Sequence, residues 1–448
     1  MAAGGVHQRA IDVFTYYYGE LESGVTGMIP EADVDPLGEI AHASSLEVSD
    51  EDQRAAAAKT AIIKLNGGLG TSMGMDKAKS LLRVRGDLSF LDIIVGQVRQ
   101  VRESYGVGLP IIFMNSFRTR EDTLEALAPY PDLAVDGLPL DFLQNREPKL
   151  LADTLSPVDW PADPSLEWCP PGHGDLYTAL EVSGVLDALL DAGYSYATVS
   201  NADNLGASPD PAMMGWFAAS GAPYAAEVCL KTPADVKGGA LVVRRSDGRL
   251  VLRETAQTLV EDMEEATDPD RHRYFHTNNL WFDLHVLRTT LEARDGILGL
   301  PLIRNDKTVD PSDPSSTKIV QIESAMGAAV EVFDGAVAIE VERARFLPVK
   351  TTNDLLLMRS DVYGVGADFR VRAQVDKPAL INLDRRFYST IAGFDARVPE
   401  APSLVDARSL TVHGDWRFGR GVVVSGDAVL EDTGAAEAVP PSARLGDS

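Results

Sequence analysis

The chain has 448 residues, 45% of them apolar, which favours two or three folding units with a sizeable core. Its 41 basic and 67 acidic side chains leave a formal charge of -26, which argues against a nucleic-acid backbone or an anionic membrane as main partner, since both would be repelled. Neither a secretory signal nor an apolar run of the roughly 18 residues that a membrane helix needs is visible. We therefore expect a cytoplasmic enzyme, and the negative charge does not argue against a small anionic substrate, because a few local lysines and backbone N–H groups can hold phosphates.

The beginning of the chain differs in character from the rest. Ala10, Val13 and Tyr17 recur at helical spacing, and residues 47–52 are strongly acidic. This pattern predicts an N-terminal helical extension over residues 1–55.

From residue 61 onward, short β-rich runs alternate with helical patterns. The expected strands are 61–65, 111–114, 196–200, 225–230, 280–284 and 336–341, and the clearest helical patterns are 90–105, 119–127 and 177–192. Alternation of this kind predicts an α/β domain with a largely parallel sheet, here over residues 56–365.

The last part of the chain, residues 366–448, shows a six-residue period. Apolar residues six apart form two series, Leu410, Trp416, Val422, Ala428 and Val412, Phe418, Val424, Leu430. Small or acidic turn residues separate them, which is typical of the coils of a β-helix. A chance run in a β-rich tail is the alternative. Because three or four coils are short for a free solenoid, we expect them to pack on the α/β domain or on another subunit.

A glycine-rich loop follows the first expected strand directly. Residues 64–74 read Lys-Leu-Asn-Gly-Gly-Leu-Gly-Thr-Ser-Met-Gly, and Lys77 and Lys79 come just after. Glycines let the backbone approach a ligand closely, successive N–H groups can hold an anion, and a lysine adds a mobile positive charge. The loop is neither a Walker A loop nor a dinucleotide fingerprint, because the spacing of its glycines matches neither pattern. It predicts a phosphate site, and a tight turn with only a packing role is the alternative.

Further motifs follow in order. They are Met-Asn-Ser-Phe at 114–117, Gln-Asn-Arg at 144–146, Pro-Pro-Gly-His-Gly-Asp at 170–175, Asn-Ala-Asp-Asn-Leu-Gly at 201–206, Thr-Asn-Asn-Leu-Trp at 277–281, Gln-Ile-Glu-Ser-Ala-Met-Gly-Ala at 321–328 and Arg-Phe-Leu-Pro-Val-Lys-Thr-Thr at 345–352. With the glycine loop they resemble the eukaryotic-type UTP–glucose-1-phosphate uridylyltransferases over roughly residues 55–430. The resemblance implies a Rossmann-like, GT-A-like nucleotide-diphospho-sugar transferase domain with a mixed, mostly parallel sheet, followed by a C-terminal β-helix domain.

The resemblance also implies a UTP site. Its residues would be Leu65, Asn66, Gly67, Gly68, Lys79, Met114, Gln144, Gly172, Asn201 and Lys350. A glutamine amide both donates and accepts, which suits the imide edge of uracil, and a glycine at 172 lets backbone lie against the ring. One departure is the stretch Met75-Asp76, where eukaryotic members carry a glycine-proline pair before the second lysine. Because Lys79 still aligns, we expect phosphate binding to survive.

The sugar phosphate and the metal would lie nearby. By resemblance, the glucose 1-phosphate site comprises His173, Asn201, Asp203, Asn278, Asn279 and Leu280. Asp203 comes just past an expected strand, where ligands of open α/β sheets bind, and a carboxylate there suits Mg²⁺. Without the resemblance, Asp203 could equally be a turn residue, His173 a surface group and Lys350 a solvated charge.

These assignments imply a reaction. A sugar-phosphate oxygen attacks the α-phosphorus of UTP in line and pyrophosphate leaves, with Lys79, Lys350 and Asp203 as catalytic residues and Mg²⁺ as cofactor. The alternatives are a pyrophosphorylase for galactose 1-phosphate or an N-acetylhexosamine 1-phosphate, an inactive sugar-nucleotide sensor, and a glycosyltransferase that uses a ready-made nucleotide sugar. The C-terminal β-helix would provide the contact surface for a homo-oligomer.

Overall fold

A ten-stranded mixed sheet forms the centre of the protein, which a computed structural model describes for residues 1–232 and 238–446. Its strands are β1 (Val34–Pro36), β2 (Thr60–Asn66), β5 (Ile111–Asn115), β6 (Asp141–Leu143), β10 (Tyr196–Asn201), β11 (Tyr224–Leu230), β12 (Ala240–Arg244), β13 (Leu250–Arg253), β14 (Tyr274–Asp283) and β17 (Val337–Glu340). Strands β1, β13 and β14 run against the other seven, so the sheet is mixed and mostly parallel, as predicted.

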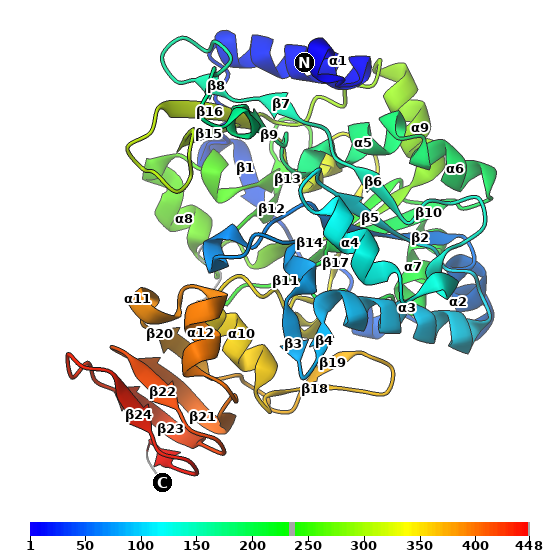
Figure 1. Cartoon of the computed structure of the whole chain (residues 1–448). Helices are drawn as coiled ribbons and strands as arrows, with labels where there is room; N and C mark the ends of the chain where they lie inside the picture. Colours follow the sequence, from blue (N-terminus) through cyan, green and yellow to red (C-terminus); the bar gives the residue numbers. More distant parts are fainter. Residues whose placement is uncertain (233–237, 447–448) are drawn as a thin grey trace.

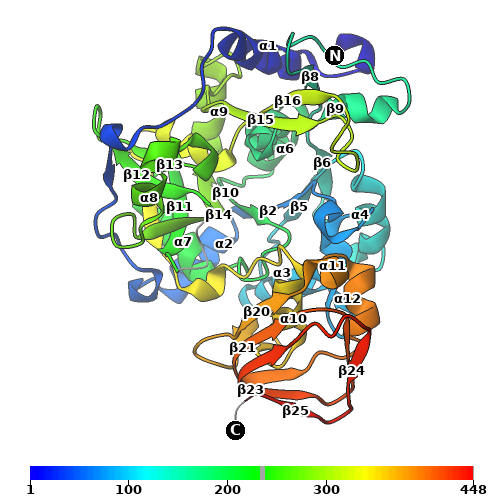
Figure 2. The ribbon, with the colours of Figure 1, turned by 90° about the vertical axis from the view of Figure 1, so that its left-hand side faces the viewer.

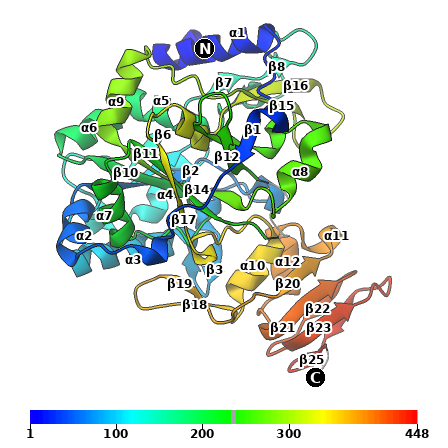
Figure 3. The same ribbon diagram turned by 180° about the vertical axis from the view of Figure 1, so that it is seen from behind.

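Helices cover both faces of this sheet (Figure 1). One face carries α2 (Asp50–Ala57), α3 (Phe90–Tyr105) and α7 (Pro211–Ser220), and the other carries α5 (Leu176–Val182), α6 (Val185–Asp191) and α9 (Leu284–Ala293). Successive residues of β2 alternate between the faces, so that Ile62 joins the first core cluster while Ala61 and Ile63 join the second. The view from behind shows the same three layers (Figure 3).

Most expected elements are present with small shifts. The expected helix at 177–192 is divided into α5 and α6, because Gly184 adopts a φ of 75°, outside the helical region. The expected strand at 280–284 is only the end of β14, which begins at Tyr274. Strand β14 runs between β11 and β10 at its end but between β11 and β12 at its start.

The N-terminal stretch contains a helix and a strand. Helix α1 (Gln8–Glu22) packs on α5, and β1 pairs with β12 of the central sheet. The predicted helical extension therefore also includes a strand, because Val34 fits the sheet edge and is 1% exposed.

The C-terminal segment consists mainly of parallel strands beneath the α/β body (Figure 2). One sheet has the order β20 (Leu380–Leu383), β21 (Ser403–Val412), β23 (Val423–Leu430) and β25 (Arg444–Leu445), and β22 (Trp416–Phe418) pairs with β24 (Glu437–Val439). Its apolar residues share one core cluster with α3 and with α10 (Thr352–Arg359). The segment is thus packed on the α/β body.

Smaller elements complete the chain. They are β3 (Arg83–Arg85), β4 (Leu88–Ser89), α4 (Arg120–Leu127), β7 (Glu147–Pro148), β8 (Leu150–Leu151), β9 (Trp168–Cys169), α8 (Met263–Thr267), β15 (Ile303–Thr308), β16 (Lys318–Glu323), β18 (Tyr363–Val365), β19 (Val371–Ala373), α11 (Arg385–Tyr388) and α12 (Ile391–Arg397). Across the described residues, every helix is too short or too polar to cross a bilayer.

Candidate active site

A cavity of about 270 Å³ opens where β2, β5 and β10 end. Because these strands are parallel, their carboxyl ends meet at one edge of the sheet, which is where α/β proteins bind ligands. Eleven of the predicted site residues line it, namely Leu65, Asn66, Gly67, Gly68, Lys79, Met114, Gln144, Gly172, His173, Asn201 and Asp203. The structure therefore brings together motifs that are distant in the sequence.

The glycine loop forms one wall of this cavity. A Cβ on Gly67 would lie 2.8 Å from Oε1 of Gln144, so glycine here lets that amide rest against the loop without a shift. A Cβ on Gly68 would meet nothing within 4 Å, because this position faces open space. The loop is held in place by the amide of Lys79, which donates to the carbonyl of Gly68 over 3.3 Å.

Lys79 and Asp203 form an ion pair inside the cavity. The Lys79 ammonium donates to Oδ2 of Asp203 over 2.7 Å, and the two side chains are only 18% and 20% exposed. The other oxygen of Asp203, Oδ1, is buried and has no hydrogen-bond partner among the described residues. A buried carboxylate oxygen without a donor is suited to a cation ligand.

A second cavity of about 310 Å³ adjoins the first. His173 and Asn201 line both cavities, while Asn278 and Lys350 line only the second. Nδ1 of His173 accepts a hydrogen bond from the amide of Met326 over 2.9 Å, so the proton of the neutral ring lies on Nε2. Desolvation in this wall lowers the pKa of His173, which keeps the ring neutral and Nε2–H available to a ligand.

Lys350 reaches the second cavity from a segment that contacts the Asp203 loop. The amide of Val349 donates to the carbonyl of Asp203 over 3.3 Å. The Lys350 ammonium lies 5.9 Å from the ring centre of Phe346, and Glu254 lines the same cavity. Burial raises the pKa of Glu254, and the charge of Lys350 opposes that rise. Two cationic side chains, one in each cavity, thus flank the Asp203 loop.

Comparison with known proteins shows the family of this chain. The family model of UTP–glucose-1-phosphate uridylyltransferase matches residues 13–425. The chain belongs to this family. A probable UTP–glucose-1-phosphate uridylyltransferase of Schizosaccharomyces pombe is 39% identical over 83% of this chain and 73% of its own length. The UTP–glucose-1-phosphate uridylyltransferase of Solanum tuberosum is 38% identical over 86% of this chain and 80% of its own.

Solved structures of UDP-glucose pyrophosphorylases have the same fold. A structure from Leishmania major is 40% identical, with a TM-score of 0.93 over 100% of this chain and 97% of its own. A UDP-glucose phosphorylase from Trypanosoma brucei is 39% identical, with a TM-score of 0.92 over the same shares of the two chains.

Two residues that the family resemblance assigns to the sugar line neither cavity. Asn279 is 1% exposed, and its amide donates to Oε2 of Glu227 over 3.0 Å. Leu280 is fully buried between Val199 and Ala226 of the neighbouring strands. Strand alternation separates Asn279 from Asn278, because neighbouring side chains point to opposite faces of β14, whereas Leu280 packs in the second core cluster. Asn278 does line the second cavity, at a φ of 59°, and its Oδ1 is buried without a partner.

Several cavity residues of this uridylyltransferase-family chain were missed by sequence reasoning. The first cavity also includes Ser80, Pro170 and Ala202, and the second includes Glu254, His276, Asn305 and Glu323. Burial, together with the nearby His173, lowers the pKa of His276 to about 4. The available signal was a polar residue within or just after an apolar strand, as with His276 in β14 and Glu254 after β13.

Proposed function

We propose that the protein joins UTP to glucose 1-phosphate, forming UDP-glucose and pyrophosphate. The observation that supports this most directly is the pair of adjoining cavities that share His173 and Asn201. The glycine loop, Met114 and Gln144 line the first cavity, which suits UTP. Asn278 and Glu254 line the second, and their amide and carboxylate suit sugar hydroxyls. The sugar phosphate would then lie at the junction, next to the α-phosphate of UTP.

The reaction needs charge stabilisation more than proton transfer. The attacking phosphate oxygen is already an anion, and the α-phosphorus exchanges its bond to pyrophosphate for a bond to that oxygen. Lys79 and the N–H groups of residues 67 and 68 would hold the UTP phosphates, and Lys350 would approach from the other side. His173 would donate Nε2–H to the sugar phosphate. Positioning two repelling anions in line is therefore the main catalytic task.

Mg²⁺ is the proposed cofactor. Among the described residues, no three His, Cys, Asp or Glu side chains form a metal-binding group, so Asp203 would be its protein ligand, with phosphate oxygens and water completing the shell. The unpartnered Oδ1 of Asp203 fits this role. When bound, the ion would neutralise charge on the phosphates.

A pyrophosphate-release assay over a panel of nucleotides and sugar 1-phosphates tests the function. We expect UTP with glucose 1-phosphate and Mg²⁺ to be the best combination. The substitutions Lys350→Gln and Asp203→Asn should each reduce kcat at least about 100-fold without unfolding the protein. Faster turnover of galactose 1-phosphate or an N-acetylhexosamine 1-phosphate would overturn the sugar assignment. If no sugar phosphate gives pyrophosphate release, the proposed enzymatic activity is wrong.

We also propose that residues 56–365 form a GT-A-like catalytic domain and residues 366–448 a C-terminal β-helix. The pairing of Leu410 with Ala428 and of Val412 with Leu430 supports coils of three six-residue turns.

Val429, which is 55% exposed, and Leu380, which is 66% exposed, would allow a homo-oligomer to form through this segment. Light scattering on the wild type and on Val429→Glu tests the assembly. The cytoplasmic location stays a prediction.

A further inference from the structure

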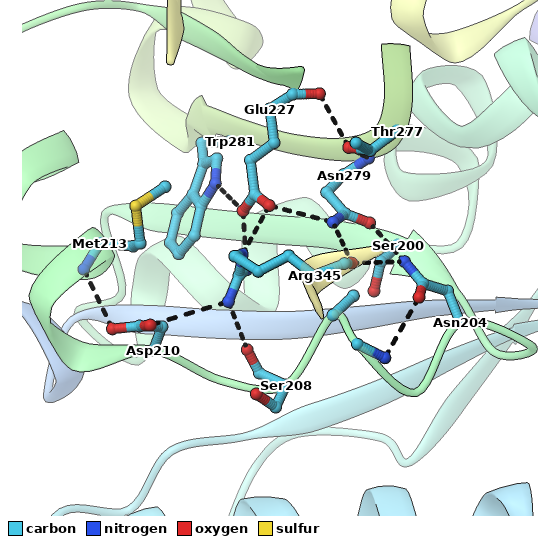
Figure 4. A network of polar contacts seen from close by, with 12 residues as sticks. Ser200, Asn204, Ser208, Asp210, Met213, Glu227, Thr277, Asn279, Trp281 and Arg345 are labelled. Atoms are coloured by element: carbon cyan, nitrogen blue, oxygen red, sulfur yellow. Dashed lines mark hydrogen bonds and ion pairs between the residues drawn. The ribbon is translucent and has the colours of Figure 1, made fainter. Parts of the chain in front are cut away.

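A buried ion pair lies in the network drawn in Figure 4. Nε and Nη2 of Arg345 donate to the two carboxylate oxygens of Glu227 over 2.7 and 2.8 Å. The Glu227 side chain is 0% exposed and that of Arg345 only 14%. Removing both charges from water is costly, so such a pair persists only where further hydrogen bonds complete it.

Those further hydrogen bonds are present. The indole N–H of Trp281 donates to Oε1 of Glu227 over 2.9 Å, and the amide of Asn279 donates to Oε2 over 3.0 Å. Burial alone would raise the pKa of Glu227, but the charge of Arg345 and these hydrogen bonds hold it below its usual range. The carboxylate therefore stays ionised and fully bonded, and it holds Arg345 and Asn279 in fixed orientations.

The network extends to the loop that carries Asp203. Nδ2 of Asn204 donates to Oδ1 of Asn279 over 3.2 Å and to the carbonyl of Arg345 over 3.1 Å. Oδ1 of Asn204 accepts from the amide of Leu347 over 2.8 Å. Asn204 is 2% exposed and directly follows Asp203. One amide side chain thus fastens the Asp203 loop to the segment that leads from Arg345 to Lys350.

The two segments also meet through their backbones. Asn204 and Pro348 form an isolated antiparallel bridge, and the amide of Val349 donates to the carbonyl of Asp203. These contacts join Asp203 and the residue after it to the two residues that precede Lys350 in the chain. The separation of the Asp203 carboxylate from the Lys350 ammonium therefore depends on this contact.

We propose that Asn204, Asn279, Glu227 and Arg345 are positioning residues that set Lys350 against Asp203 for uridylyl transfer. The inference rests on the proposed function, and it replaces the sugar-binding role expected for Asn279. An error of about 1 Å in placing a charged group can cost about 100-fold in rate. A positioning role would explain why polar side chains occupy this buried site, because packed apolar residues could fill it at no loss of stability.

The test is a double-mutant cycle between Asn204→Ala and Lys350→Gln. We expect Asn204→Ala to lower kcat about 30-fold and to leave the KM for UTP within about twofold, because the UTP cavity is untouched. In the Lys350→Gln background the same change should lower kcat less than about threefold, since the group it positions is gone. An equal loss in both backgrounds, or an unchanged kcat in a folded variant, would overturn the proposal.

Two further variants sharpen the test. Asn353→Ala removes a comparable hydrogen bond, from the Leu383 amide over 3.1 Å, close to Lys350 but outside the network. It should lower thermal stability and leave kcat within about twofold. If Asn204→Ala does not fold, Arg345→Lys enters the same cycle, because it keeps the charge but loses the two-pronged geometry. A kcat of Arg345→Lys equal to that of the wild type would count against the proposal.

A readout without turnover separates this inference from the proposed function. Hydrogen exchange at the amides of Leu347 and Val349 should accelerate at least about tenfold in Asn204→Ala, because one amide loses its acceptor and the other loses its neighbouring bridge. Unchanged exchange would overturn the positioning role even if the wild type is active. A wild type that releases no pyrophosphate would instead overturn the proposed function. The exchange data alone would then show whether Asn204 holds the segment that leads to Lys350.

Discussion

The ammonium of Lys79 lies 2.7 Å from Oδ2 of Asp203, while Oδ1 of the same carboxylate is buried without a partner among the described residues. One oxygen is thus neutralised by the protein, and the other remains available to a cation. Lys79 would have two tasks, holding the Asp203 carboxylate and contacting the UTP phosphates. Its loss should affect both.

We therefore predict that Lys79→Gln lowers kcat/KM for UTP between about 100-fold and 1000-fold. Lys77→Gln is the matched control, because Lys77 follows the same loop but is 61% exposed and lies 3.7 Å from Asp122. It should retain activity within about twofold, since an exposed ion pair contributes little. Steady-state kinetics on both variants provide the measurement, and equal losses would contradict the assignment of Lys79.

Gly68→Ala should weaken UTP binding without destabilising the fold. The added methyl group would enter open space in the first cavity, and the φ of Gly68 is not in the left-handed region. We expect the KM for UTP to rise at least about tenfold while the thermal midpoint stays within about 1 °C. An unchanged KM would show that the loop backbone does not approach the nucleotide.

Much of the α/β domain could be predicted because its strands are short apolar runs bounded by turns. The segment 111–114 needed no tertiary information, since all of β5 is buried. Strand β1 could not be predicted this way, because only one of its three residues is buried and its pairing with β12 is set by tertiary contacts. The mixed direction of the sheet likewise depends on β14, whose middle carries polar residues.

The site could be predicted only where several motif residues lie close together in sequence. The glycine loop was recognisable on physical grounds, whereas Lys350 depended on the family resemblance because a single lysine is usually a surface charge. Asn278 and Asn279 show the limit. Both are asparagines in one strand and point to opposite faces, and the sequence does not show that Asn279 bonds to the buried Glu227 while Asn278 faces the cavity.

His173 can be tested with two amides that imitate different ring nitrogens. The substitution His173→Gln places a donor close to the position of Nε2. The substitution His173→Asn places an acceptor close to the position of Nδ1, which accepts the hydrogen bond from the Met326 amide. If Nε2–H contacts the sugar phosphate, His173→Gln should lose less than about tenfold in kcat/KM for glucose 1-phosphate, and His173→Asn about 100-fold. The reverse order would assign His173 a purely structural role.

Asp175 allows a prediction about stability and pH. It is 6% exposed, and burial raises its pKa to about 7 although the hydrogen bonds from Asn145 act in the opposite direction. The folded chain therefore keeps this proton between pH of about 4 and 7, where the unfolded chain has released it. Because the folded state binds more protons there, the contribution of Asp175 to the unfolding free energy falls as pH rises through that window and is lost above it.

Asp175→Asn removes this titration. From pH 5 to pH 8, the unfolding free energy of the variant should rise relative to that of the wild type by about 2 kcal/mol. Urea unfolding at the two pH values measures the difference, and the loss of a hydrogen bond to Asn145 cancels because it affects the variant equally at both pH values.

Asp163→Asn is the control, because the pKa of Asp163 is shifted in the opposite direction. Hydrogen bonds from Ser165 lower the pKa of Asp163, so this carboxyl is ionised in both states from pH 5 to pH 8, and Asp163→Asn should show no relative change over that range. A parallel pH dependence of wild type and Asp175→Asn would show that the carboxyl group is ionised throughout, and that its contacts with Asn145 outweigh its burial.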